Sequence, residues 1–504
     1  MKWSALIFLF TICHLKVLGQ MQVGDLHFIS KIENSNLLME DEVYVHSAIY
    51  PQIKFEQKPV VWDSWIKNEI ADFPEPVKHL RVYPLADLSG GYSSTEAVAY
   101  AVGAGAGVDL SYSKFFLTTK FLPFLSEPNF VSSQIQNANG TTPGSMRSFD
   151  GNLFCQGELI AAYKLNKFFT VLGGYGKNFF GEGYRSLLLS DNATAQPFAK
   201  IETTFGPIKY VNLYQMWTDN PLTPLDRTFD QYKFSATHYL SWNITREINL
   251  GVFETVVWQN QDSAVNRTFD FNYLNPFVFY RSVEYGIGSA DNVLLGLNLT
   301  GKINGNHQVY TQFLLDEFLL SEIKAQNGWW GNKFGFQFGY KSNRFFLEDL
   351  YFQTEFNVVR PFTYSHKYST QNYGHLNASV THPLGANFYE LLNILSYQKG
   401  DFRITNRIVL NSYGIDTGAV SNGQNIFASY SDRESDFGHT IGQGLRKTVL
   451  NENIIVHYPI FKAIDLYAFA QYNWRMEWQS TGTSHEHFLS LGIRSRLWNS
   501  YTDF

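Results

Sequence analysis

Apolar and polar side chains alternate with a period of two in several segments of this chain, and this pattern constrains the fold more than any other feature. Successive side chains of a β-strand point to opposite faces, so each segment is predicted to be a strand with two different faces. One face carries leucine, valine and aromatic residues, and the other carries small or polar residues. The clearest such segments are 98–108, 295–303, 334–340, 466–478 and 489–497.

A membrane-spanning helix needs roughly 20 consecutive apolar residues, and no segment beyond the N-terminal region approaches this length. Segment 97–108 is continuous in apolar and glycine residues but is too short to span as a helix. Strands of about ten residues with an apolar outer and a polar inner face are typical of transmembrane barrels. Lipid cannot satisfy backbone hydrogen bonds, so a closed barrel is the structure expected. The alternative is a soluble β-sandwich or propeller, in which the apolar faces would pack against another sheet.

The connections between these segments alternate in length. Outer-membrane barrels have short periplasmic turns and long external loops. Short turns are predicted at 165–166, 206–207, 245–247, 304–306, 342–343 and 399–401. Long loops are predicted within 122–152, 177–196, 217–232, 260–270, 360–386 and 416–442. Pairing the segments predicts a large antiparallel barrel of about 16–18 strands, with the boundaries between 273 and 292 left open.

Composition and the N-terminal residues complete the predicted organisation. Of the 504 residues 17% are aromatic and only 17% are charged, and the net charge of -6 argues against a nucleic-acid partner. Residues 1–19 have the charged start and apolar region of a signal peptide. Residues 20–90 are predicted to form a small periplasmic or plug segment with an amphipathic helix at 60–71, and residues 91–504 the barrel. Beyond the signal peptide only Cys155 remains, so no intrachain disulfide is expected.

The loop 173–193 combines glycines, aromatic rings and both charges between two predicted strands. Aromatic rings can stack on the apolar faces of sugars, and the polar groups can bond hydroxyl groups or acids. We expect this loop to fold over and seal the mouth of the barrel, and the alternative is direct contact with a glycan, since functional loops often lie on rigid scaffolds. The candidate glycan-binding residues are Tyr175, Lys177, Asn178, Phe180, Glu182, Tyr184, Arg185, Asp191 and Asn192.

The inward faces of the later strands are rich in charge. Arginine binds carboxylates through two parallel hydrogen bonds, so an arginine ladder could hold an anionic polysaccharide. The other interpretation is an internal salt-bridge network that fills the lumen. The predicted lumen-facing charges are Glu355, Arg403, Arg407, Arg475, Glu477, Arg494 and Arg496.

Two other features are candidate sites. Glu254 falls on the apolar face of its strand, where a charge facing lipid is costly, so a bulge or a rim position is expected rather than a functional carboxylate. His366, His375 and His382 share one long loop, and a loop surface is expected there rather than a metal site. No nucleophile elbow, phosphate loop, EF-hand or HExxH motif occurs, so no enzyme, cofactor or metal is predicted, although a hydrolase triad needs no local signature.

Several motifs after about residue 90 resemble, in order, those of the outer-membrane capsule-assembly (Wzi-like) family and more closely its gliding-motility (RemB-like) branch. They are Phe180-Gly181-Glu182-Gly183, Ser186-Leu187-Leu188-Leu189-Ser190, Asn192-Ala193, Pro197-Phe198, Tyr273-Leu274-Asn275-Pro276, Leu314-Leu315-Asp316-Glu317-Phe318, Trp329-Trp330-Gly331-Asn332-Lys333-Phe334-Gly335, Val359-Arg360-Pro361-Phe362-Thr363-Tyr364-Ser365-His366 and Asn372-Tyr373-Gly374-His375.

The resemblance implies a non-enzymatic barrel in the outer membrane of a Bacteroidota-type bacterium. It would attach or assemble capsule or exopolysaccharide, or act in gliding motility. Its partners would be outer-membrane lipid, surface polysaccharide and gliding or secretion machinery proteins. Three alternatives stay open: a transport channel whose inward arginines select anions, an outer-membrane hydrolase, and a partner-binding component of a motility or secretion complex.

Overall fold

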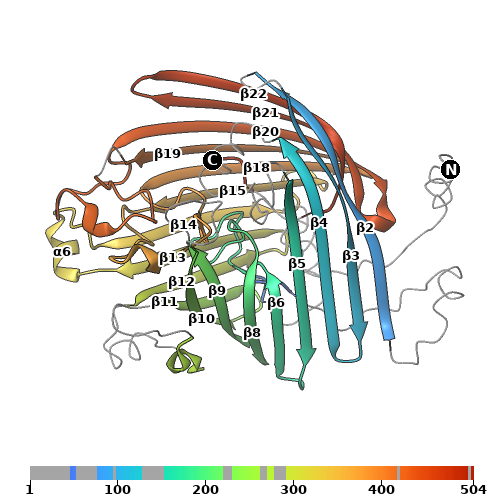
Figure 1. The fold of residues 1–504 in the computed structure, drawn as a ribbon, viewed down its shortest axis with the longest axis horizontal. Helices are drawn as coiled ribbons and strands as arrows, with labels where there is room; N and C mark the ends of the chain where they lie inside the picture. The colour runs from blue at the N-terminus through green and yellow to red at the C-terminus, as the bar shows by residue number, and fades with distance from the viewer. Residues whose placement is uncertain are drawn as a thin grey trace, which may run out of the picture.

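The computed structural model describes residues 46–52, 77–94, 98–127, 153–219, 230–260, 269–276, 291–416, 420–497 and 501–504. Within these residues eighteen antiparallel strands form one closed barrel, which confirms the predicted fold class and reaches the upper end of the predicted strand number (Figure 1). The ring closes where β2 pairs with β22, for example Leu88 opposite Ile493.

The barrel strands follow one another around the wall in chain order. They are β2 (Val77–Ser93), β3 (Ala99–Tyr112), β4 (Phe115–Glu127), β5 (Leu153–Lys164), β6 (Phe169–Gly176), β8 (Gln196–Phe205), β9 (Ile208–Asp219), β10 (Gln231–Asn243), β11 (Ile248–Gln259), β12 (Asn292–Ile303), β13 (His307–Glu317), β14 (Lys333–Ser342), β15 (Leu350–Val359), β18 (Phe388–Lys399), β19 (Phe402–Ile415), β20 (Leu445–Phe461), β21 (Leu466–Gln479) and β22 (Gly482–Ser495).

Short elements accompany the barrel. Two-stranded pairs form between β1 (Ile49–Tyr50) and β7 (Phe179–Phe180) and between β16 (Gly374–His375) and β17 (Ala378–Ser379). The helical turns are η2 (Phe271–Leu274), α6 (Leu320–Ala325), η3 (Ser369–Gln371), η4 (Tyr430–Asp432) and η5 (Lys462–Ile464). In the described part of the chain, no helix is long and apolar enough to cross a membrane.

Because consecutive strands are antiparallel, the short turns of the described residues lie at one end of the barrel, and the longer connections leave and re-enter the wall at the other. Between β12 and β13, Asn304 and Gly305 adopt left-handed φ values of 50° and 71°, which asparagine and glycine tolerate best. Because the loop-bearing end of such barrels faces the cell exterior, we refer to it as the outer end. The stretch 273–292, whose boundaries the sequence left open, holds the last two residues of η2 and the start of β12 at Asn292.

The outer wall carries the predicted apolar belt. Leu297 of β12 is 47% exposed and Leu491 of β22 is 67% exposed, whereas their strand neighbours Asn298 and Ser490 are buried on the lumen side. A belt of exposed leucine and aromatic side chains is unfavourable in water and favourable against hydrocarbon, so it marks the surface that lipid covers.

The barrel begins at Val77, so the boundary expected at residue 90 falls inside β2. Pro84 and the pair Gly90-Gly91 interrupt the alternating pattern, because proline and glycine weaken the strand signal. Residues 46–52 reach the interior, where β1 pairs with β7. The signal peptide and the helix at 60–71 lie outside the described residues and stay predictions.

We expect Leu297→Arg to destabilise the barrel by about 2–4 kcal/mol, because a charge at mid-depth must be transferred into hydrocarbon. Urea unfolding of the protein in phospholipid vesicles measures this cost. Ser435→Arg, at an exposed position in an outer loop, is the control and should change stability by less than about 0.5 kcal/mol. Equal effects of the two variants would contradict a lipid-facing belt.

Candidate functional site

The loop between β6 and β8, residues 177–195, folds into the lumen, and we call it the plug loop. Its first residues form β7, which pairs with β1. Gly181 follows at φ 149°, and a Cβ atom there would lie 2.4 Å from Nε2 of Gln312 on the wall. The glycine therefore allows the loop to pass against the wall as it crosses the lumen.

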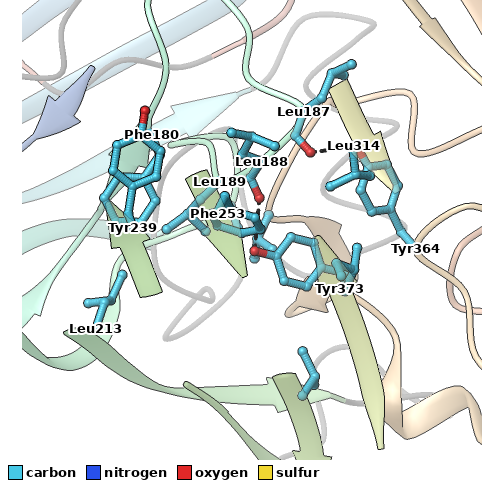
Figure 2. Close-up of a cluster of buried hydrophobic side chains, with 14 of the residues drawn as sticks. Phe180, Leu187, Leu188, Leu189, Leu213, Tyr239, Phe253, Leu314, Tyr364 and Tyr373 are labelled. Carbon is cyan, nitrogen blue, oxygen red and sulfur yellow. Dashed lines mark hydrogen bonds between the residues drawn. The ribbon is translucent and has the colours of Figure 1, made fainter. Parts of the chain in front are cut away.

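Apolar side chains hold the plug loop at the centre of the barrel. Leu187, Leu188 and Leu189 are fully buried. The ring of Phe180 stacks on Tyr239 of β10 with centroids 4.7 Å apart (Figure 2). The hydroxyl groups of Tyr364 and Tyr373 donate hydrogen bonds to the carbonyl oxygens of Leu187 and Leu188 over 2.8 and 2.9 Å (Figure 2). The segment 360–387, which carries both tyrosines, and the plug loop thus pack as one unit.

A buried ion cluster fixes the middle of the plug loop. The guanidinium group of Arg185 lies 2.8 Å from Asp503 and 3.3 Å from Glu390 of β18, and all three side chains are at most 1% exposed. Arg407 of β19 approaches the second oxygen of Asp503 at 2.8 Å. Burial alone would raise the pKa of Asp503, but Arg185 and Arg407 hold that pKa below its ordinary value. The carboxylate therefore stays ionised between two guanidinium groups.

Further contacts join the plug loop to the wall and to the segment Tyr501–Phe504. Glu355 of β15 accepts the main-chain N–H groups of Tyr184 and Arg185 at 2.8 and 3.1 Å. The hydroxyl of Tyr501 donates to Asp191 over 2.6 Å. The final residues therefore lie inside the lumen against the plug loop, beyond the end of β22.

The structure places the predicted glycan-binding residues mostly in this interior. Tyr175 in β6 and Asn192 are half-buried, and the other seven residues of the set are buried. Lys177 donates to the carbonyl of Asp191 over 2.9 Å, Glu182 accepts from Lys341 at 3.1 Å, and Asn192 donates to the carbonyl of Ser379 at 2.8 Å. The loop thus fills the lumen, and glycan contact through these residues stays a prediction.

The predicted lumen-facing charges also have protein partners. These contacts form an internal network, in which each partner belongs to the barrel wall or to a segment inside it. Besides Glu355 and Arg407, these contacts join Arg403 to Gln398 (3.1 Å), Arg475 to the main-chain oxygen of Phe504 and to Glu477 (3.5 Å), Glu477 to Lys447 (2.7 Å), Arg494 to Asp87 (3.0 Å) and Arg496 to the hydroxyl of Tyr467 (3.0 Å).

Sequence reasoning missed two members of the ion cluster. Glu390 lies on the inward side of β18, and the same parity argument that identified Glu355 could have found it. Asp503 lies in a short polar segment whose position no local pattern indicates.

A second candidate site lies at the outer end, where three loops meet. We define the outer loop face as Trp329, Trp330, Tyr368, Tyr430 and Arg433. The rings of Trp330 and Tyr430 lie 4.6 Å apart, and the guanidinium group of Arg433 sits 4.0 Å from the Trp330 ring centroid. Arg433 also pairs with Asp436 at 2.6 Å, which fixes its plane over the ring. Tyr368 is 46% exposed and the other four residues are half-buried, so the face presents ring surface to solvent.

His366 supports the outer loop face from below. It is buried, and its ring lies 5.8 Å from Tyr430 and 6.0 Å from Tyr368. Burial, together with the charges of Lys333 and Lys367, lowers the pKa of His366 from 6.5 to about 3. The histidine is therefore neutral when the loop is docked. Among the described residues no group of three or more His, Cys, Asp or Glu side chains is arranged to hold a metal ion.

Comparison with known proteins relates this architecture to solved barrels. No protein-family description matches the chain, and no curated protein matches its sequence. The structure is similar to Wzi of Escherichia coli, described as a carbohydrate-binding β-barrel involved in group 1 capsule assembly, with a TM-score of 0.57, 11% identity, and coverage of 94% of this chain and 99% of that chain. The outer membrane protein OprD of Pseudomonas aeruginosa matches with a TM-score of 0.44, 10% identity, and coverage of 84% and 95%.

The closed barrel, its apolar belt and its likeness to the Wzi fold identify the protein as a β-barrel of the outer membrane, which confirms the predicted localisation.

Arg185→Met should destabilise the protein by about 3–5 kcal/mol, because it leaves the buried carboxylates of Asp503 and Glu390 with less compensating charge. Arg494→Met is the matched control. Its side chain is 39% exposed beside Asp87, so its loss should cost less than about 1 kcal/mol. Urea unfolding in detergent micelles compares the two, and similar losses would show that the cluster does not stabilise the plug loop.

Acid should loosen the loop that carries His366. The undocked loop takes up a proton below the ordinary pKa of 6.5, whereas the docked loop does so only near 3, so docking weakens as pH falls between these values. The loss is roughly 2 kcal/mol at pH 5. Hydrogen exchange of residues 364–372, corrected for its intrinsic pH dependence, measures it, and His366→Gln should abolish most of the effect. Unchanged protection of the natural protein at pH 7.5 and 5 would refute the prediction.

Proposed function

We propose that this protein is a non-enzymatic outer-membrane barrel that holds cell-surface polysaccharide, in capsule or exopolysaccharide attachment or assembly. The observation that carries the proposal is the outer loop face, a set of half-exposed aromatic rings on three packed loops at the outer end. Likeness in fold to Wzi, a carbohydrate-binding barrel of capsule assembly, supports it.

The contacts within the face suit a sugar chain. The Trp330 ring is already oriented by Tyr430 and Arg433, so binding would lose little side-chain freedom. Tyr368 projects beside it, and the rings would stack against the apolar faces of sugar units. Lys367 and Glu434, both exposed on the same loops, would bond hydroxyl or acid groups at the rim of the site.

The filled lumen favours this role over a transport channel. The plug loop, residues 46–52 and Tyr501–Phe504 occupy the interior with buried apolar and paired charged groups. A transport channel would require these segments to move out of the lumen and open a path for solutes. The RemB-like resemblance supports a variant of the proposal, in which motility or secretion proteins bind the same barrel during gliding.

The test is glycan binding by folded protein in detergent or nanodiscs, on arrays of acidic and neutral surface polysaccharides. We expect Trp330→Ala and Tyr368→Ala each to weaken binding about tenfold, equivalent to about 1.4 kcal/mol. Phe346→Ala is the matched control, because Phe346 is 89% exposed at the opposite end of the barrel. Equal binding by all three variants would reject the outer loop face as the site.

Planar-bilayer conductance separates the channel alternative. The natural protein should give no steady current, since the described segments fill its lumen. Large steady currents together with an absence of glycan binding would favour transport.

A further inference from the structure

A polar pair lies on the lipid-facing side of the wall, in the middle of two strands. Glu254 of β11 stands directly opposite His238 of β10, and the pairing register runs through both residues without a shift. Their strand neighbours Phe253 and Tyr239 point into the lumen, where both rings contact Phe180. Since side chains alternate along a strand, Glu254 and His238 must point outward. The bulge or rim position expected for Glu254 is therefore wrong.

Both side chains are nevertheless buried, at 0 and 1% exposure, with Nδ1 of His238 3.8 Å from Oε2 of Glu254. Outward residues of nearby strands are open, such as Leu297 at 47% and Ile201 at 38%. The wall across β10 and β11 is thus covered from outside at a level where neighbouring strands expose the lipid-facing belt.

A segment of the long connection between β11 and β12 provides cover on the outside of the wall. We call residues 269–276, which include η2, the outer strap. Figure 1 shows η2 as a short yellow-green ribbon beyond the strands below the β10 label. Tyr273 packs on Trp258 with ring centroids 4.8 Å apart, and Phe269 contacts Phe234 at 5.8 Å. Nε2 of His238 lies 3.0 Å from the carbonyl oxygen of Asn275 and can donate a hydrogen bond to it.

Polar groups of the outer strap form hydrogen bonds with one another and with neighbouring protein groups, as a segment beside hydrocarbon requires. Oδ1 of Asp270 accepts from the main-chain N–H of Asn272 at 3.0 Å, and its carbonyl accepts from Tyr273 at 3.2 Å. The hydroxyl of Tyr273 donates to Asp291 over 2.6 Å. The surface that faces away from the wall exposes two apolar side chains, Phe271 at 77% and Leu274 at 43%, and also Asn272, whose amide group donates to Oδ1 of Asp270 over 2.9 Å.

We propose that the outer strap is a lipid-binding element that docks on the barrel wall and presents Phe271 and Leu274 to the acyl chains of the outer leaflet. The occupant is lipid because the exposed pair continues the belt of exposed apolar side chains on β12 and β8. His238 and Glu254 are the anchor: the histidine bonds the strap, and the strap in turn keeps the carboxyl group out of hydrocarbon.

Site-directed fluorescence tests the proposal. Single cysteines replace Phe271, Leu297 and Ser435 in a background that carries Cys13→Ser and Cys155→Ser, and each receives an environment-sensitive label. The three proteins are placed in phospholipid vesicles that contain doxyl-labelled lipid, and iodide serves as the water-soluble quencher. We expect the labels at Phe271 and Leu297 to be quenched several times more by doxyl lipid than the label at Ser435, and iodide to quench only the last.

Two results would overturn the lipid contact. Quenching of the Phe271 label by iodide and not by doxyl lipid would place the strap in water. Protection from both quenchers would mean that protein covers it, either a second copy or another partner. Gel mobility of unheated and heated samples confirms that each variant contains a folded barrel.

The anchor has its own test. His238→Leu combined with Glu254→Leu removes the hydrogen bond to Asn275 and leaves no unpaired charge in the wall. We expect the barrel to stay folded while the label at Phe271 becomes at least twice as accessible to iodide. Unchanged quenching in this double variant would show that the polar pair does not hold the strap.

Discussion

Hydrocarbon offers no hydrogen-bond partners, so the backbone groups of the edge strands must pair with each other. The pairing of β2 with β22 closes the ring, and the rest of the structure depends on it. Once the ring is closed, every strand has two neighbours and one face against lipid. The other face lines an interior enclosed by eighteen strands, which is too large for the side chains of the wall alone to fill. Closure therefore satisfies the backbone hydrogen bonds of every strand, but it leaves a wide interior that other segments must fill.

The chain fills that lumen with its own segments. Apolar contacts of Leu187–Leu189 remove the plug loop from water, and the ion cluster of Arg185, Asp503 and Glu390 fixes its register against the wall. Charges in such an interior are stabilising only as a complete set, because each unpaired member would lose its hydration without compensation. Buried carbonyl groups also need hydrogen-bond partners, and Tyr364 and Tyr373 supply them to the plug loop.

The outer loop face rests on this interior. His366 supports Tyr430 and Tyr368, and it lies in the segment 360–387 that also holds the plug loop. The outer loop face, which we propose as the glycan-binding surface, and the filled lumen are thus parts of one packed unit. Polar side chains on the outside of the wall are also kept from an unfavourable environment, since Glu254 and His238 are covered where lipid would otherwise contact them.

Local sequence patterns were enough to predict the barrel, because the period-two alternation in segments such as 334–340 and 466–478 is favourable in lipid only when the strands close into a ring. They also indicated the turns, since Asn304 and Gly305 tolerate left-handed backbone, and which face of β15 or β19 turns inward, since parity is local. The sequence analysis did not predict most of β2, because Pro84 and Gly90 weaken the alternating pattern of that strand.

The position of the loop after β6 depends on long-range contacts of the folded chain. The composition of residues 173–193 is compatible with sugar contact and with sealing of the barrel. The position of the loop depends on partners far away in the chain, such as Glu355 for the backbone of Tyr184 and Asp503 for Arg185. The position of Asp503 inside the lumen and the cover over Glu254 are likewise long-range. Local alternation determines which face of a strand a side chain lies on. Its burial depends on which distant segments of the folded chain pack against that face.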